Sequence, residues 1–344
     1  MLAAECKKRI ESAKSLLGKG SVLLLSSGPD SSNVNPSFYY FTGLDIDGCL
    51  LAISQDSHSL ICPEMNRLYA GENMPGSMGL LVYKDRAGFS KSLKSAMGGA
   101  GRLLLDYPST RLSFAESLCK ITKARREDFS GQIAKLRAVK SGYERECLQK
   151  SVTEAESLLS FLESGISEGM TEKKIESMLL GEMLSRNLKP SFAPIISSGA
   201  NSSMPHSHPT GNKVKCHVLV DMGVKVEGYC SDLTRCFFFN SGRMQKNAYD
   251  KLTLVCDEIC DRAASGGFSK ASELAAESAL LLERYGLPSL PHSIGHGIGL
   301  EVHESPSLGL KSKDALSKGM ALAIEPAAYY PGRFGVRCER DVFL

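Results

Sequence analysis

Residues 218–235 read Val-Leu-Val-Asp-Met-Gly-Val-Lys-Val-Glu-Gly-Tyr-Cys-Ser-Asp-Leu-Thr-Arg. Short apolar runs on either side of a central turn predict two antiparallel strands, about 216–223 and 228–239. In that pairing Asp221 and Asp232 are expected to lie nearly opposite each other, with Cβ atoms about 5 Å apart. Two carboxylates at that separation repel, and strand interiors disfavour aspartate. A bound cation is the simplest compensation that this stretch predicts.

A second pair of carboxylates repeats the arrangement near the end of the chain. Glu325 follows the apolar run Ala-Leu-Ala-Ile, and Glu339 ends the segment Val-Arg-Cys-Glu. We expect strands at 319–325 and 334–343 that form a second hairpin. A lone glutamate in so apolar a setting would be a buried unpaired charge, which is strongly unfavourable. The two acid-bearing hairpins predict two half-domains related by pseudo-two-fold symmetry.

An imidazole completes this set of donors. His296 lies in Gly-His-Gly-Ile-Gly, where glycines let the backbone pack close to a cluster. Four carboxylates and one imidazole offer enough donors for two divalent metal ions and a bridging water. Oxygen-rich ligation with one imidazole favours manganese, with cobalt, iron or zinc as alternatives. The predicted metal ligands are Asp221, Asp232, His296, Glu325 and Glu339.

Other histidines lie beside these segments. His206 lies in Met-Pro-His-Ser-His, while His292 precedes His296 by four residues and His303 follows it by seven. A single histidine is more often a packed or surface residue than a functional one. Their grouping around the expected ligands makes them candidates for the same site.

The composition is that of an ordinary soluble globular protein. Net charge is only +3 over 344 residues, so nothing in it suggests nucleic acid or a membrane as a partner. We see no basic-then-apolar leader and no apolar run long enough to span a bilayer. The eleven cysteines, which form no Cys-x-x-Cys pair, indicate reduced thiols and a cytoplasmic location.

The order of predicted elements indicates an α+β chain with two domains. Strands alternate with helices over residues 1–130, which predicts a small α/β domain. Residues 131–344 are expected to form a larger α+β domain in which antiparallel sheet is backed by helices. The strands expected in the first domain are 22–26, 49–53, 59–62, 79–83 and 102–106, with helices at 86–98 and 111–120; the helices expected in the second are 143–166, 171–187, 243–264 and 270–285, with a further strand at 193–198.

The ordered set of these segments resembles the creatinase/aminopeptidase P/prolidase family, the pita-bread metallopeptidases of family M24. The resemblance runs in order through the C-terminal two thirds of the chain. Phe38-Tyr-Tyr-Phe-Thr-Gly and Arg137-Ala-Val-Lys-Ser extend it to the N-terminal, creatinase-like domain and the junction. The matching segments are Phe192–Asn201, Pro205-His206, Asp221-Met-Gly, Gly228–Arg235, Gly295–Glu304, Ile324–Pro326 and Val336–Glu339.

The resemblance implies a role for each predicted ligand. Asp232 and Glu339 would bridge two metal ions, Asp221 would complete the coordination of one, and His296 and Glu325 that of the other. A hydroxide between the metals would attack the carbonyl that precedes a proline nitrogen.

The resemblance also implies a catalytic and a substrate-binding set. His206 and His303 would steady the tetrahedral intermediate and move protons, and Glu325 would also serve as a base. The chain departs from the family at Ala327, where glycine is common. The residues expected to line the proline side of the pocket are His292, Arg337 and Phe192.

The resemblance implies an Xaa-Pro aminopeptidase, which removes the first residue from short peptides with proline in second position. An Xaa-Pro dipeptidase (prolidase) is the alternative, and the choice depends on whether a group past the proline captures a C-terminal carboxylate. Methionine aminopeptidase uses the same ligand types but usually lacks the N-terminal domain. A catalytically inactive pita-bread binding protein is a remote alternative, which the intact ligand set disfavours. The resemblance further suggests a homodimer.

Overall fold

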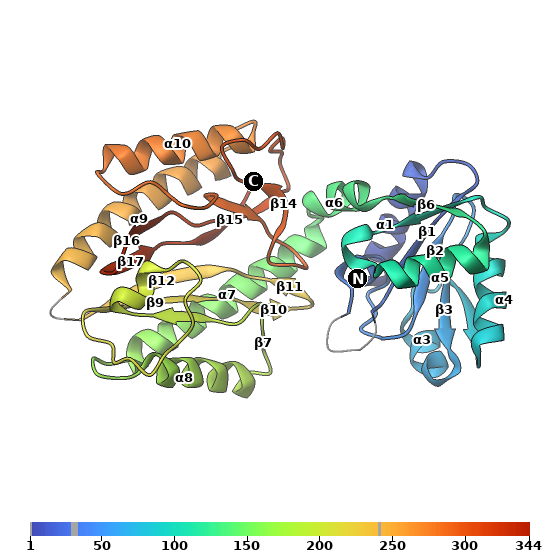
Figure 1. Ribbon diagram of the computed structural model, residues 1–344, viewed down its shortest axis with the longest axis horizontal. Helices are drawn as coiled ribbons and strands as arrows, with labels where there is room; N and C mark the ends of the chain where they lie inside the picture. The colour runs from blue at the N-terminus through green and yellow to red at the C-terminus, as the bar shows by residue number, and fades with distance from the viewer. Residues whose placement is uncertain (1, 29–33, 240–241) are drawn as a thin grey trace. The chain divides into compact units, whose positions relative to one another are not determined.

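The computed structural model describes residues 2–28, 34–239 and 242–344. It divides into two compact units, residues 1–137 and 138–344, each of which has its own buried core (Figure 1). Within the described ranges, no helix combines the length and the apolar character needed to cross a membrane.

The first unit is built on a six-stranded mixed sheet in the order β4-β3-β2-β1-β5-β6. Strand β1 (Ser21–Ser26) is central, pairing antiparallel with β2 and parallel with β5. It is buried along most of its length, which explains its nearly continuous apolar sequence. The other elements are α1 (Leu2–Leu16), α2 (Pro36–Thr42), β2 (Leu50–Ile53), β3 (His58–Pro63), η1 (Glu64–Asn66), α3 (Arg67–Asn73), β4 (Gly79–Tyr83), α4 (Arg86–Met97), β5 (Arg102–Leu105), η2 (Tyr107–Ser109), α5 (Leu112–Thr122), β6 (Arg125–Asp128) and α6 (Ser130–Ala138).

The second unit begins with α7 (Gly142–Gly165) and α8 (Glu172–Ser185). Ser141 and Glu144 form a capping box at the start of α7, which satisfies backbone N–H groups that a helix start leaves unpaired. The later pair α9 (Arg243–Ala264) and α10 (Ala271–Arg284) lies on the other side of the strands from α7 and α8 (Figure 1). Two helical layers therefore enclose the strands that carry the predicted ligands.

Those strands form two hairpins of similar construction. In the first, β9 (His217–Met222) pairs with β12 (Leu233–Phe238), and β10 (Val224–Val226) pairs with β11 (Tyr229–Cys230) nearer the turn. In the second, β15 (Ala321–Ile324) pairs with β18 (Arg340–Phe343), and β16 (Ala327–Tyr330) pairs with β17 (Phe334–Arg337). Each hairpin has a break between its outer and inner strand pairs. The remaining elements are β7 (Lys189–Pro190), β8 (Ile195–Ser197), η3 (Gly199–Ser203), β13 (Gly295–Gly297) and β14 (Glu304–Ser307).

Candidate metal and peptide site

The first hairpin places its two aspartates on neighbouring, not opposite, positions. A two-residue turn with Glu227 at φ 50° and Gly228 at φ 81° fixes the register. In that register Asp221 lies opposite Thr234, and Asp232 lies just beyond the ladder. The aspartates were expected nearly opposite each other, but the residue that pairs with Asp221 lies two positions beyond Asp232, because the turn is centred one residue later than their midpoint. Residues 232 and 234 share a face of an extended strand, so the aspartates are diagonal neighbours.

The second hairpin does set its two glutamates across from each other. Ile324 pairs with Arg340 in the outer ladder, so Glu325 and Glu339 are the next residues on the two strands. Both backbones are tied to other segments of the site. Glu325 donates its N–H to the carbonyl of residue 294 at 2.8 Å, and the guanidinium of Arg235 donates to the carbonyl of Glu339 at 2.7 Å. These bonds bring the two hairpins and the His296 segment together.

Three of the predicted ligands form a compact cluster. Asp232, His296 and Glu339 each offer one donor atom, and the three atoms lie within 4.8 Å of one another. Nε2 of His296 is 3.6 Å from Oδ2 of Asp232 and 4.0 Å from Oε1 of Glu325. Nδ1 of His296 lies 3.1 Å from the carbonyl of Gly297, an arrangement that favours a proton on Nδ1 and a lone pair on Nε2. The imidazole therefore faces the carboxylates as a ligand would.

Arg337 connects the fourth carboxylate to this cluster. Its Nη2 binds Oδ2 of Asp221, and its Nε donates to Oγ1 of Thr234 at 3.1 Å. The hydroxyl of Thr234 in turn donates to Oε2 of Glu339 at 2.6 Å. The second oxygen of Asp221, Oδ1, is buried and has no hydrogen-bond partner among the described residues. A buried acceptor of this kind can serve as a metal ligand.

The electrostatics of the cluster fit the binding of divalent cations. Burial, followed by repulsion from neighbouring carboxylates, raises the pKa of Asp232 and of Glu339 well above the usual range. Burial raises the pKa of Glu325 to about 7 and lowers the pKa of His296 to about 4. Acids held where their charge is unfavourable, beside a neutral imidazole, form a donor set suited to divalent metals.

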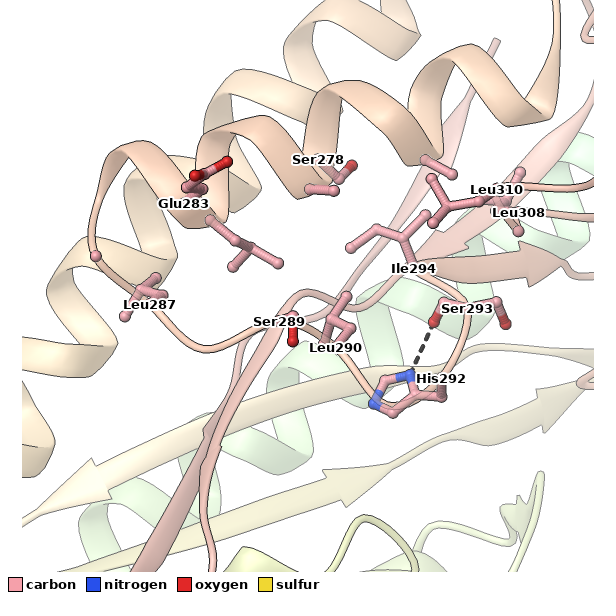
Figure 2. A pocket seen from close by; sticks show the side chains of 15 residues that line it. Ser278, Glu283, Leu287, Ser289, Leu290, His292, Ser293, Ile294, Leu308 and Leu310 are labelled. Atoms are coloured by element: carbon pink, nitrogen blue, oxygen red, sulfur yellow. Dashed lines mark hydrogen bonds between the residues drawn. The ribbon is translucent and has the colours of Figure 1, made fainter.

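His292 lies at the edge of a pocket next to α10 (Figure 2). The pocket has a volume of about 540 Å³ and is lined mainly by apolar side chains from α10 and from residues 286–294 and 308–310. Nδ1 of His292 is 2.7 Å from the carbonyl of Ser293. The pocket therefore lies against the segment that the sequence predicts to contact proline.

Tyr329 joins His292 to the cluster, and it was not among the residues predicted for the site. Its hydroxyl lies 3.2 Å from Nε2 of His292 and accepts from Nη1 of Arg337 at 2.9 Å. Burial raises the pKa of Tyr329 to about 12, so the phenol is neutral and can donate to the imidazole. The sequence offers one signal for Tyr329. It lies two residues beyond Ala327, so the two side chains share a face of the strand.

The remaining predicted residues lie on two exposed loops and one connecting segment. The ring of His303 lies 4.3 Å from that of His296, centroid to centroid, in an edge-on arrangement. Pro205, which precedes His206, accepts at its carbonyl from Nη1 of Arg337 at 3.3 Å. Phe192 is partly buried in the segment between β7 and β8, and its place at the pocket wall stays a prediction.

Comparison with protein-family models identifies both parts of the chain. Residues 146–344 match the model of metallopeptidase family M24. Residues 18–139 match the model of the creatinase/prolidase N-terminal domain.

Individual relatives match along nearly the whole chain. An Xaa-Pro dipeptidase of Pyrococcus horikoshii is 28% identical over 320 residues, which cover 90% of this chain and 88% of that protein. The crystal structure of the prolidase from Pyrococcus horikoshii OT3 superposes with a TM-score of 0.85 at 26% identity, covering 99% of this chain and 95% of that one. The X-Pro aminopeptidase structure from Thermotoga maritima MSB8 shares the fold, with a TM-score of 0.84 at 24% identity and coverage of 96% and 95%.

These matches confirm the predicted architecture of a creatinase-like α/β domain followed by a pita-bread α+β domain. They also confirm the prediction of a metal-dependent hydrolase, and they imply divalent metal ions as its cofactors. The chain belongs to metallopeptidase family M24.

Proposed function

We propose that this protein is a dinuclear-metal exopeptidase that hydrolyses the peptide bond before proline, and that it acts as an Xaa-Pro aminopeptidase. Convergence of Asp232, His296 and Glu339 within 4.8 Å, with Glu325 adjacent, carries this proposal. The names of the relatives, which are Xaa-Pro peptidases, support the substrate class.

The contacts of Arg337 favour an aminopeptidase over a dipeptidase. A dipeptidase needs a group past the proline that captures the substrate's C-terminal carboxylate. Arg337 is the cationic side chain on that side, yet each of its nitrogens already donates within the protein, to Asp221, Tyr329, Pro205 and Thr234. These four bonds use four of the five guanidinium N–H groups, so a terminal carboxylate that binds through both oxygens would have to displace one of these acceptors. The second candidate, an Xaa-Pro dipeptidase, is supported by the names of several curated relatives.

In the proposed mechanism the metals would be held by Asp221, Asp232, His296, Glu325 and Glu339. When bound, two such ions polarise a carbonyl and supply a nucleophile from water at neutral pH. The exposed imidazoles of His206 and His303 would donate to the oxygen of the scissile carbonyl and pass a proton to the leaving proline nitrogen. The carboxylate of Glu325 would accept a proton, and His292 would orient the proline ring, held by Tyr329.

Three further assignments complete the proposal. We propose manganese as the native metal, because oxygen-rich ligation with one imidazole suits it. A homodimer in the cytoplasm is the expected form of the protein. Comparing how well manganese, cobalt, iron and zinc restore activity would test the choice of metal. Sedimentation equilibrium would test the homodimer.

The decisive experiment compares peptides of two lengths. Metal-stripped protein is assayed on Xaa-Pro and Xaa-Pro-Yaa peptides, with and without added manganese or cobalt. Metal-restored cleavage of the tripeptide indicates an aminopeptidase, whereas cleavage of the dipeptide alone indicates a prolidase. Asp232→Asn should lose bound metal and activity together, while the matched surface change Glu258→Gln should keep both. Bound metal without cleavage of either peptide would favour the inactive binding protein.

A further inference from the structure

One buried carboxylate holds both ends of a loop in the second unit. Glu172 is the first residue of α8 and its side chain is 0% exposed. Its Oε1 accepts from the backbone N–H of Ser198 at 2.7 Å. Its Oε2 accepts from Nδ2 of Asn201 at 2.9 Å, and from the backbone N–H and hydroxyl of Thr210 at 2.8 and 2.6 Å. The two ends of loop 198–210 therefore meet at one acidic side chain, and they are also held by bonds from Ser198 to the carbonyl of His217 and from Lys173 to the carbonyl of Thr210.

The far side of this loop reaches the proposed site. The backbone N–H of Gly335 donates to the hydroxyl of Ser202 at 2.9 Å, and Arg337 donates to the carbonyl of Pro205. His206 follows Pro205 directly and is exposed. The position of His206 is thus set by contacts at both sides of the loop, with Glu172 at its base.

Helix capping does not account for the buried carboxylate. Thr171 already caps α8, since its hydroxyl accepts from the backbone N–H of Lys174 at 3.2 Å. The four hydrogen bonds of the Glu172 carboxylate go instead to loop 198–210. A charge buried this completely is tolerated because several donors satisfy it, and bonds of this charged type are the strongest in proteins.

We propose that Glu172 is a positioning residue that holds His206 in its working place through loop 198–210. The inference rests on the proposed function, in which His206 serves the reaction. Glu172 touches neither substrate nor the predicted ligands in this role. Loss of its carboxylate removes four hydrogen bonds from the two ends of the loop at once, so it should affect the chemical step more than peptide binding.

The test replaces the carboxylate by an amide of the same shape. In Glu172→Gln one oxygen becomes an NH2 group, which cannot accept, so either the Ser198 N–H or the donors from Asn201 and Thr210 lose their acceptor. We expect kcat for metal-loaded protein on an Xaa-Pro peptide to fall about 10- to 100-fold, as is typical of small misplacements of a catalytic group, with a smaller change in KM. Glu168→Gln, an exposed site with the same charge change, is the matched control.

A double-mutant cycle separates positioning from general damage. If Glu172 acts through His206, then Glu172→Gln should cause little further loss in kcat once His206→Ala is present. Additive losses in the two backgrounds would overturn the inference. Thr210→Val, which removes one donor and keeps the backbone N–H, is a milder variant that should reproduce the pattern if Glu172→Gln folds poorly.

Hydrogen exchange gives a second readout that does not depend on activity. The amides of Ser198 and Thr210 should exchange faster in Glu172→Gln than in the parent protein and in Glu168→Gln. Unchanged exchange together with unchanged kcat would refute the positioning role. A parent protein that cleaves neither peptide would instead overturn the proposed function, so the two failures are distinguishable.

Discussion

Nζ of Lys140 lies 3.0 Å from Oε2 of Glu304, and the two side chains are only 2% and 5% exposed. The other carboxylate oxygen of Glu304 accepts from the backbone N–H of Glu301 at 3.1 Å. The backbone N–H of Lys140 donates to the carbonyl of Gly319 at 2.7 Å. A buried ion pair thus anchors the loop that carries His303 to the start of the second unit.

Removing one partner of this pair should be more harmful than removing both. Lys140→Met removes the cation that lies 3.0 Å from the buried Glu304 carboxylate, and removing one partner of a buried pair typically costs about 3–5 kcal/mol. Lys140→Met with Glu304→Met should recover much of that loss, because apolar side chains of similar volume replace the pair. Urea unfolding of the three proteins measures the difference. If the free energy of unfolding of Lys140→Met lies within about 1 kcal/mol of the parent value, the prediction is contradicted, because a change that small is typical of exposed ion pairs.

His217 should make the protein less stable in mild acid. Burial lowers the pKa of His217 from its usual 6.5, and Nδ1 is buried with no hydrogen-bond partner in the described structure. Nε2 lies 3.0 Å from the carbonyl of Gly335, which favours a neutral ring with its proton on Nε2. The unfolded chain therefore takes up a proton first as the pH falls. This contribution to stability is complete above pH 6.5 and decreases below it.

Unfolding free energies between pH 8 and pH 5 measure this effect. The His217 contribution should reach at most about 1.4 kcal/mol for each pH unit below 6.5. His217→Gln should be less stable at pH 8 and should lose less on acidification than the parent. An identical pH dependence in the two proteins would mean that His217 does not titrate as described.

Tyr329→Phe tests the connection between Arg337 and His292. The change removes the hydroxyl that lies 3.2 Å from Nε2 of His292 and keeps the ring, whose centroid is 5.7 Å from the imidazole. We expect KM for proline peptides to rise about 5- to 10-fold, because the loss of one hydrogen bond costs about 1 kcal/mol. The metal content should not change. Steady-state kinetics and metal analysis check the two parts. Tyr330→Phe on the same strand is the control, and a similar rise in that variant would show that the effect is not specific.

Gly223 should tolerate no side chain. A Cβ at this position would lie 1.7 Å from the carbonyl oxygen of Ser231 and 2.6 Å from its carbonyl carbon. Gly223→Ala should therefore push the two strands of the first hairpin apart at the break between β9 and β10. It should lower the free energy of unfolding by more than about 3 kcal/mol, within the range of severe overpacking. Gly211→Ala, where a Cβ would meet nothing within 4 Å, should be neutral. Thermal unfolding of the two variants provides the comparison.

The sequence predicts elements well where apolar periodicity and turn residues agree. Strand β4 and helix α9 have the predicted bounds, 79–83 and 243–264. Strand β6 could not be predicted, because Arg125-Arg-Glu-Asp contains only charged residues. It is an edge strand, and its backbone pairing with β5, not its side chains, makes it part of the sheet.

The candidate site shows the same division between local and tertiary information. Hairpin signals and buried acids suffice to select Asp232 and Glu339, because a strand carrying an acid among apolar residues needs a partner. The register of Asp221 could not be fixed, since it depends on the backbone angles of Glu227 and Gly228. The contacts of Tyr329 with His292 and Arg337 arise only when separate segments pack together, so no spacing in the sequence predicts them.

The register of the second hairpin is the same on both sides of its break, and this limits how its length can change in relatives. Tyr330 pairs with Phe334 at the tip, so insertions in residues 331–333 leave every pair below them intact. A single insertion within β16 would instead turn the side chains beyond it to the opposite face of the strand. Glu325 and Glu339 would then no longer point the same way. Related sequences should therefore differ in length at the hairpin tips and keep matched strand lengths between each tip and its acids.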